Sequence, residues 1–343
     1  MKKDVQIGAK IIGPSHPTYI IAEIGANHNR DLAIAKKLID KAAEAGVDAV
    51  KFQTYTAETL YSKHAPKFSK DDVKPFDLIK SNELPREWHH ELFDYAANNN
   101  MDFLSSPFDY NAVDQLDAIG VLAFKVASFE LIDLGLLKHI ARKNKPIILS
   151  VGLATLGEIE EALDAIRSQG NDDIILLHCA SLYPSPVEVV NLNAIKTLSK
   201  AFQIPIGFSD HTLGIHIAVA AIAKGAVVVE KHFTLDRTMK GPDHSFAIEP
   251  NELTQLVKNI RDVELAMGSG VKGRSKEEQE IYEKGRRSII AYQDIKKGTM
   301  ITKEMLVVKR PGYGIKPKYF DTVIGRVAKK DIKADYWITW DDI

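Results

Sequence analysis

Two histidines follow runs of apolar residues that are typical of buried strands. His211 comes at the end of "IPIGFSDHT" (204–212), and His232 follows three valines in "VVVEKHFT" (227–234). Burying an ionisable group costs several kcal/mol unless it is paired or bound. Neighbouring strands lie ~4.8 Å apart, so the two imidazoles could share one metal ion. Two protein ligands suit a hydrated divalent ion, Mn²⁺ or Mg²⁺. Either histidine alone would be better interpreted as a hydrogen-bonded core residue, and together they favour the metal.

Two lysines occupy similar positions in other apolar runs. Lys51 lies in "VDAVKFQT" (47–54) and Lys125 in "AFKVASFE" (123–130). Both suit an anion such as a phosphate or carboxylate. A Schiff-base lysine is an alternative. A third interpretation is a set of salt bridges to nearby acids, namely Glu23, Glu130 or Glu230.

Hydroxyl, amide and carboxyl groups also follow these runs. Glu23 could position or deprotonate a substrate hydroxyl or water. Gln53 shares a strand face with Lys51. Hydroxyl donors come from Ser106, Ser128, Ser150, Ser181 and Ser209. Asp210 could orient His211 or cap the next helix. In the turn "KGPDHSF" (240–246), Asp243 and His244 are expected to face the site, and for His244 a surface role is favoured over a catalytic one.

The elements that would position these groups alternate between β-branched runs and amphipathic segments. The runs are residues 19–25, 47–54, 101–108, 123–130, 146–152, 173–181, 204–212 and 227–234. Strand–helix alternation predicts an α/β fold with a parallel sheet. Eight units in roughly 250 residues predict a (β/α)₈ TIM barrel, whose C-terminal strand ends converge on one face. A doubly wound sheet is the alternative, but no GxGxxG turn follows the first run.

Composition limits the class of protein and its partners. The chain has 343 residues, 45% of them hydrophobic, and a net charge of −1. Near-zero charge predicts no nucleic-acid partner, and no apolar run approaches a membrane span. The one cysteine, Cys179, and the lack of a signal-like start in "MKKDVQIGAKII" favour a cytoplasmic protein.

The chain is expected to hold two domains. Residues 1–268 form the predicted barrel, 269–285 a charged linker, and 286–343 a small domain of short strands and glycine turns. This last segment carries 13 Lys and Arg against 7 Asp and Glu, whereas the rest has a net charge of −7. The imbalance fits two solvated surfaces or a basic lid over an anionic ligand. Arg310, in "VKRPGYG" (308–314), is its candidate ligand-binding residue.

The motifs together resemble the sialic acid synthase family. They are "AEIGANH", "KFQT", "FKVASFE", "GFSDHT", "VVVEKHFTLD" and "GPDHSF", followed by "IKKGT" and "VKRPG". The resemblance covers nearly the whole chain and extends to the pseudaminic and legionaminic acid synthase branches and to the spore-coat polysaccharide branch. It implies a phosphoenolpyruvate-dependent transferase that condenses this substrate with an N-acetylated hexosamine, such as N-acetylmannosamine. It also implies a C-terminal SAF (antifreeze-like) domain and a domain-swapped homodimer.

The resemblance also assigns residues. It places the metal on His211 and His232 and makes Glu23 catalytic. Phosphoenolpyruvate contacts fall on Lys51, Ser106, Lys125, Ser128, Ser150, Ser181 and Ser209. Sugar-side or supporting positions fall on Gln53, Glu130, Tyr183 and Asp243. Arg310 corresponds to an arginine given across the dimer to the sugar.

Two departures from the family pattern leave the sugar open. Arg30 stands where members often have glycine, and Ser181 where some have asparagine. Pseudaminic or legionaminic acid synthesis from a diacetamido-trideoxyhexose is therefore an alternative. Other rivals are a Schiff-base barrel aldolase on Lys125, a non-catalytic sugar-binding protein, and an enzyme that uses a phosphorylated sugar. The C-terminal domain disfavours the last.

Overall fold

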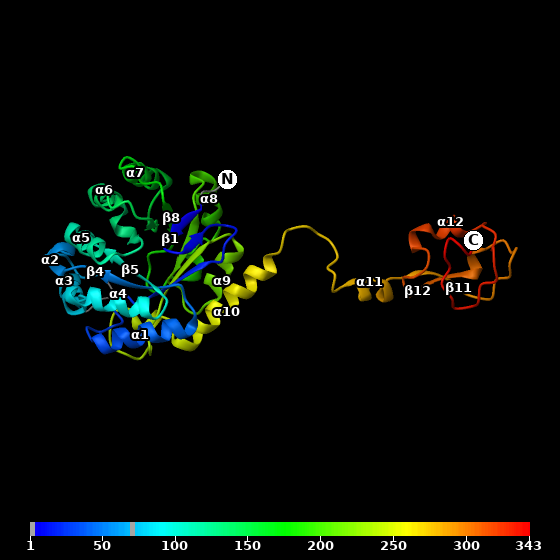
Figure 1. The fold of residues 1–343 in the computed structure, drawn as a ribbon, viewed down its shortest axis with the longest axis horizontal. Helices are drawn as coiled ribbons and strands as arrows, with labels where there is room; N and C mark the ends of the chain where they lie inside the picture. The colour runs from blue at the N-terminus through cyan, green and yellow to red at the C-terminus, as the bar shows by residue number, and fades with distance from the viewer. Residues whose placement is uncertain (1–3, 69–72) are drawn as a thin grey trace. The chain divides into compact units, whose positions relative to one another are not determined.

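The computed structural model describes residues 4–68 and 73–343, which form two compact units, Met1–Gly268 and Ser269–Ile343. The first unit is built on eight parallel strands (Figure 1). These are β3 (Tyr19–Glu23), β4 (Ala49–Thr54), β5 (Asp102–Pro107), β6 (Phe124–Val126), β7 (Ile147–Ser150), β8 (Ile174–His178), β9 (Ile206–Asp210) and β10 (Val228–His232). They pair in the order β5-β4-β3-β10-β9-β8-β7-β6, and β5 and β6 lie in contact across the remaining seam. The predicted (β/α)₈ barrel is confirmed.

Helices on the outside of the strands complete each unit of the barrel (Figure 1). They are α1 (Leu32–Ala45), α4 (His89–Asn98), α5 (Tyr110–Ile119), α6 (Leu134–Ala141), α7 (Leu156–Arg167), α8 (Asn193–Phe202), α9 (His216–Ala223) and α10 (Pro250–Met267). Their boundaries follow local chemistry. The Asp31 carboxylate accepts hydrogen bonds from two amides at the start of α1, and Gly46 ends that helix with φ 79°.

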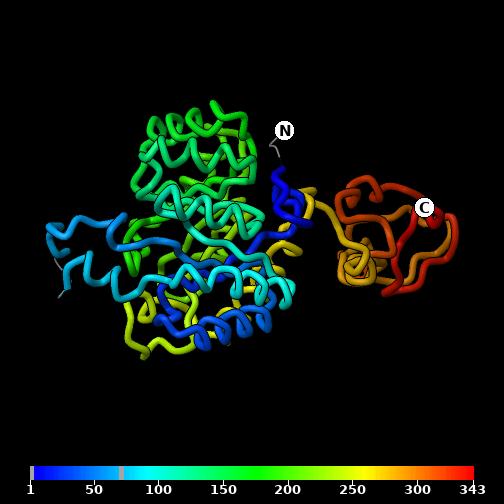
Figure 2. Tube along the Cα trace, turned by 60° about the vertical axis from the view of Figure 1, so that its left-hand side comes forward, coloured from blue at the N-terminus to red at the C-terminus, as the bar shows by residue number. Residues whose placement is uncertain are grey.

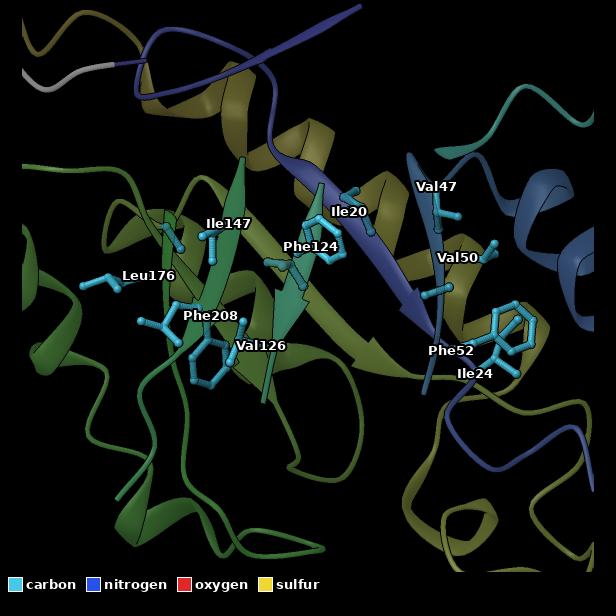
Figure 3. Packing of buried hydrophobic residues seen from close by; sticks show 14 of the residues in the cluster. Ile20, Ile24, Val47, Val50, Phe52, Phe124, Val126, Ile147, Leu176 and Phe208 are labelled. Atoms are coloured by element: carbon cyan, nitrogen blue, oxygen red, sulfur yellow. The ribbon is translucent and has the colours of Figure 1, made fainter. Parts of the chain in front are cut away.

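The strands are apolar on both faces, which gives the barrel two separate cores. Outward-facing residues such as Ile20, Phe52 and Phe208 pack under the helices (Figure 3). Inward-facing residues such as Ile21 pack with a hairpin, β1 (Val5–Ile7) and β2 (Lys10–Ile12). The apolar side chains of this hairpin fill the N-terminal end of the barrel.

The segment between β4 and α4 is longer than the other connections. It carries two additional helices, α2 (Ala57–Leu60) and α3 (Pro75–Asn82). Figure 2 shows this segment in light blue, projecting beyond the ring of helices. In residues 4–68 and 73–343, no helix combines the length and apolarity needed to cross a bilayer.

The second unit has a core of its own. Strands β11 (Ser288–Ala291) and β12 (Leu306–Lys309) pair in antiparallel fashion, and short helices α11 (Gln279–Gly285) and α12 (Phe320–Val323) flank them. Its core includes Ile289, Ile295, Ile301, Ile315 and Ile338. Helix α11 lies within the predicted linker, and the Glu283 carbonyl accepts a hydrogen bond from Gly312 N at 2.7 Å.

Candidate active site

The two-residue period of the strands brings the polar groups together. Along β3, Tyr19 and Ile21 belong to the inner core, so Glu23 faces the same way at the C-terminal end. Strands β4, β5, β7 and β10 repeat this order, with an inward apolar residue below and an inward polar residue above, and Ala123 precedes Lys125 in the same way at β6. The polar set comprises Glu23, Lys51, Gln53, Ser106, Lys125, Ser150, Ser209, His211, Glu230 and His232. The structure therefore gathers these predicted residues at the C-terminal mouth of the barrel.

Glu230 lies between the two predicted lysines. Its Oε2 is 3.7 Å from Lys51 Nζ and its Oε1 is 3.7 Å from Lys125 Nζ. Burial alone would raise the pKa of Glu230, but attraction by both ammonium groups lowers it. Burial lowers the pKa of Lys125 more than Glu230 raises it. Serine hydroxyls complete the cluster, since Lys125 donates to Ser150 Oγ at 2.7 Å.

Glu23 lies on the other side of Lys51. Its Oε2 is 2.7 Å from Lys51 Nζ, and Gln53 Nε2 donates to its Oε1 at 2.8 Å. Burial raises the pKa of Glu23 to about 7 despite the attraction of Lys51. Burial would lower the pKa of Lys51, but Glu23 and Glu230 raise it. Lys51 therefore stays charged, while Glu23 can gain or lose a proton near neutral pH.

His211 and His232 are both suited to bind a metal as neutral imidazoles. Burial lowers the pKa of each, and for His232 repulsion from His211 adds to the effect. The Ala180 carbonyl can only accept, so at 2.8 Å it fixes the proton of His211 on Nδ1 and leaves Nε2 as a lone-pair donor. His232 Nδ1 has no hydrogen-bond partner among the described residues. The two ring centroids are 5.6 Å apart.

The donor set fits a metal that keeps most of its ligands as water or substrate. In the part of the chain that the structure describes, no group of three or more His, Cys, Asp or Glu side chains could hold an ion. Two imidazoles with nearby carboxylates suit Mn²⁺ or Mg²⁺ under that condition.

Small donor groups of Ser128, Gly152, Cys179 and Ser181 meet beside Lys125, above β7 and β8, and this cluster is called the cradle. Ser128 Oγ accepts a hydrogen bond from Gly152 N at 3.0 Å and lies 3.2 Å from Cys179 Sγ. The buried Ser181 Oγ has no hydrogen-bond partner among residues 4–68 and 73–343. A Cβ on Gly152 would lie 2.4 Å from Ser181 Oγ and 2.8 Å from Cys179 Sγ. A larger residue at this position would displace these side chains.

We expect Gly152→Ala to raise KM for an anionic substrate at least ~10-fold, because the new methyl group occupies space lined by the donor groups. Gly157→Ala is the matched control, since its Cβ would meet no atom closer than 4.0 Å. Steady-state kinetics with both variants test this. An unchanged KM in Gly152→Ala would show that no substrate group enters the cradle.

A cavity of about 420 Å³ opens outward from His232. Four residues predicted for the sugar side line it, together with His232: Gln53, Glu130, Tyr183 and Asp243. The Tyr183 ring packs against His211 with centroids 4.3 Å apart. Asp243 Oδ2 accepts a hydrogen bond from Ala26 N at 3.3 Å and lies 3.8 Å from His232 Nδ1. Burial raises the pKa of Glu130 to about 7 and that of Asp243 to about 6.

Some expectations from the sequence are wrong in detail. Strand β6 stops at Val126, and Ser128 and Glu130 lie on a 3₁₀ turn (Ser128–Ile132) instead of the strand. His244 is buried, not at the surface, because its ring contacts Thr234 Oγ1 at 2.6 Å and Asn29 Oδ1 at 3.0 Å.

Asp210 neither orients His211 nor caps α9. Its Oδ2 is 2.7 Å from the buried Lys231 Nζ, and its Oδ1 accepts from Thr212 N. Lys231 also donates to the Thr212 carbonyl at 2.6 Å. This outward-facing ion pair joins the ends of β9 and β10, which carry the two histidines. Two successive apolar runs end in Asp-His and Lys-His, and this pattern could have indicated the ion pair. The pair was not predicted from the sequence.

The sequence also singles out Arg310 and Arg30. Arg310 belongs to the second unit, so its part in the site stays a prediction. Arg30 has φ 53°, a left-handed conformation that glycine adopts at little cost, and it donates to the Lys80 carbonyl at 3.3 Å.

Comparison with known protein families gives two matches along the chain. Residues 38–272 match the NeuB family, and residues 286–343 match the SAF domain. The SAF match spans the segment predicted for it.

Individual relatives cover almost the full length. An N,N'-diacetyllegionaminic acid synthase from Campylobacter jejuni is 46% identical, over 93% of this chain and 98% of that protein. A pseudaminic acid synthase from Helicobacter pylori is 37% identical, over 95% and 98%. The crystal structure of an N-acetylneuraminic acid synthetase from Leptospira borgpetersenii, in complex with citrate, superposes with a TM-score of 0.75. It is 36% identical and covers 82% of this chain and 95% of that one.

Proposed function

Because this chain belongs to the NeuB family, we propose that it condenses phosphoenolpyruvate with an N-acetylated hexosamine, such as N-acetylmannosamine, and releases phosphate. The observation that carries the proposal is the pair of buried lysines, Lys51 and Lys125, together with two neutral imidazoles, of which His232 lines a cavity. Cationic and hydroxyl groups there suit a small, highly charged anion. The cavity suits an uncharged sugar.

The reaction forms one carbon–carbon bond and breaks one carbon–oxygen bond. The methylene carbon of phosphoenolpyruvate attacks the aldehyde carbon of the open-chain sugar, whose oxygen takes up a proton. Water then adds to the enol carbon, and the tetrahedral intermediate loses phosphate by cleavage of its carbon–oxygen bond. The products are a nonulosonic acid and inorganic phosphate.

Each group of residues has a role in this reaction that follows from its position in the site. Lys51 and Lys125, with the five predicted serines, hold the anionic substrate and stabilise the departing phosphate. Glu23, with its pKa near 7, accepts a proton from the attacking water. Gln53, Glu130, Tyr183 and Asp243 orient the sugar. In this proposal His211 and His232 hold Mn²⁺ or Mg²⁺, which when bound acts as a Lewis acid toward the aldehyde oxygen.

We further propose that the protein works in the cytoplasm as a homodimer in which Arg310 of one subunit serves the site of the other. Exposed apolar side chains in the loops after β6, β7, β8 and β9 support an interface near the mouth: Ile132, Leu153, Leu182 and Leu213. We expect a dimer in sedimentation, and a monomer for the double variant Ile132→Asp/Leu213→Asp. A monomeric wild type at micromolar concentration would contradict the proposal.

The reaction is tested by measuring phosphate release from phosphoenolpyruvate with Mn²⁺ and a panel of hexosamines. The panel holds N-acetylmannosamine and the diacetamido-trideoxy sugars that lead to legionaminic and pseudaminic acid. We expect release with at least one sugar, loss on chelation, and a fall of at least ~10³-fold in His211→Ala. Covalent trapping of Lys125 by borohydride with a keto acid would instead support the Schiff-base aldolase. Sugar binding with no phosphate release would support the non-catalytic protein.

A further inference from the structure

Two loops at the mouth of the barrel are joined by a buried histidine. His244 lies on the loop that follows β10, and its Nε2 is 3.0 Å from Oδ1 of Asn29, on the loop that follows β3. Its Nδ1 is 2.6 Å from the hydroxyl oxygen of Thr234, two residues after His232. His244 and Thr234 are both fully buried. The proposed reaction assigns no role to this histidine.

The partners of His244 fix which of its ring nitrogens carries the proton. Asn29 Oδ1 can only accept a hydrogen bond, so Nε2 carries the proton and donates to it. Nδ1 then accepts from the Thr234 hydroxyl. Burial lowers the pKa of His244, which favours this neutral form. The imidazole therefore makes one hydrogen bond within its own loop and one that crosses to the other loop.

Asp243 is the site residue that lies next to this bridge. It lines the cavity, and its Oδ2 accepts a hydrogen bond from Ala26 N at 3.3 Å and lies 3.8 Å from His232 Nδ1. A separation of 3.3 Å is longer than most N–H···O hydrogen bonds, so this contact alone holds the carboxylate weakly. Because His244 is the next residue in the chain, its bond to Asn29 also holds the backbone that carries Asp243.

We infer that His244 is a positioning residue. Its bridge from Thr234 to Asn29 holds the loop after β10 against the loop after β3 and so places the Asp243 carboxylate in the wall of the cavity. The inference rests on the proposed function, in which Asp243 orients the sugar, and it adds to that function a residue that does not touch the substrate.

Loss of the bridge should affect the sugar more than phosphoenolpyruvate. Lys125 and Ser150, which are assigned to phosphoenolpyruvate, lie on β6 and β7, whereas the bridge joins the loops after β3 and β10. A misplacement of about 1 Å in a group that orients a substrate can cost about 10²-fold. We expect KM for the sugar to rise at least ~10-fold, and KM for phosphoenolpyruvate to change less than ~2-fold.

Conservative substitutions separate the two hydrogen bonds of His244. In His244→Gln the amide reaches the place of Nε2 and keeps the bond to Asn29, whereas in His244→Asn the shorter amide keeps only the bond to Thr234. Asn29→Gly removes the acceptor without forcing the backbone, because Asn29 has φ 50°. We expect a higher sugar KM in His244→Asn and Asn29→Gly, and recovery of most of the wild-type value in His244→Gln.

The test is phosphate release by the full-length enzyme with Mn²⁺, with KM measured for phosphoenolpyruvate and for the hexosamine that supports the reaction. His89→Asn is the matched control, because His89 is also buried and bonds a threonine, Thr54 Oγ1 at 2.7 Å, but lies at the start of α4. Thermal unfolding verifies that the variants fold. If His244→Asn does not, Asn29→Gly carries the test. Hydrogen–deuterium exchange of residues 240–247 measures the order of the loop independently of activity.

The outcomes separate the two proposals. A higher sugar KM and faster exchange in His244→Asn and Asn29→Gly, with recovery in His244→Gln, support the inference. A wild-type sugar KM in all three variants, or equal rises in KM for both substrates, overturns it and leaves the condensation reaction standing. Phosphate release with none of the sugars overturns the proposed function. In that case the bridge stands if exchange is faster in His244→Asn and is restored in His244→Gln, and it falls if exchange is unchanged.

Discussion

Lys51→Met is expected to lower kcat/KM for phosphoenolpyruvate by about 10³-fold. Removing one well-placed charge-stabilising donor from a buried site costs roughly 10²–10³ in rate, and Lys51 is a cation held in place before substrate arrives. It contacts Glu23 at 2.7 Å and Ser106 at 3.3 Å and is only 3% exposed. Methionine keeps the length and apolar stem of the side chain but not the charge. Steady-state phosphate release measures the effect.

Lys10→Met is the matched control for this variant. Lys10 also binds carboxylates, with Nζ 3.5 Å from Asp48 and 3.3 Å from Asp102, but these contacts lie with the hairpin at the N-terminal end of the barrel. We expect its kinetics to equal those of the wild type. Similar losses in both variants would mean that a general effect on the fold, and not a role for Lys51 at the substrate, explains the result.

Asp210→Ala is expected to destabilise the barrel by about 3–5 kcal/mol. It removes one member of a buried ion pair and leaves the Lys231 ammonium, 2% exposed, without its carboxylate. Thr212 N loses its acceptor as well. Because the pair joins β9 to β10, the same change should disturb both histidines. Urea unfolding measures the stability, and phosphate release the activity.

The double variant Asp210→Leu/Lys231→Met separates charge from packing. Replacing both charges with apolar groups should recover most of the lost stability, since no uncompensated charge remains. Removing the exposed Glu280, whose partner Lys284 is also exposed, should change stability little. If Asp210→Ala unfolds at the same urea concentration as the wild type, the ion pair does not stabilise the ends of β9 and β10.

The barrel could be predicted because its signal is local. In each strand the apolar residues come first and the polar residues last. Successive side chains point to opposite faces, and this alternation decides which polar groups face inward. Contacts between strands that are distant in the sequence carry no such signal. The sequence left open whether Glu230 pairs with a lysine, and it is the structure that puts Glu230 between two of them.

Two other features lay beyond sequence reasoning for specific reasons. Strand β6 ends early because residues 128–132 form a 3₁₀ turn, which a short apolar run does not distinguish from a strand. His244 is buried by Thr234 and Asn29, one of them more than 200 residues away. The turn motif that contains His244 does not indicate Thr234 or Asn29 as a partner.

The hairpin that fills the N-terminal end of the barrel also constrains the order in which reactants bind and products dissociate. With Val5, Ile7 and Ile12 packed into that end, reactants are expected to enter and leave through the mouth alone. In the proposed function Lys125 and Ser150 hold the anionic reactant and the cavity takes the sugar, so the anionic reactant is expected to bind first and the sugar second. The longer product then blocks the route of phosphate. Under the proposed function, we therefore expect a compulsory-order mechanism in which the nonulosonic acid dissociates before phosphate does.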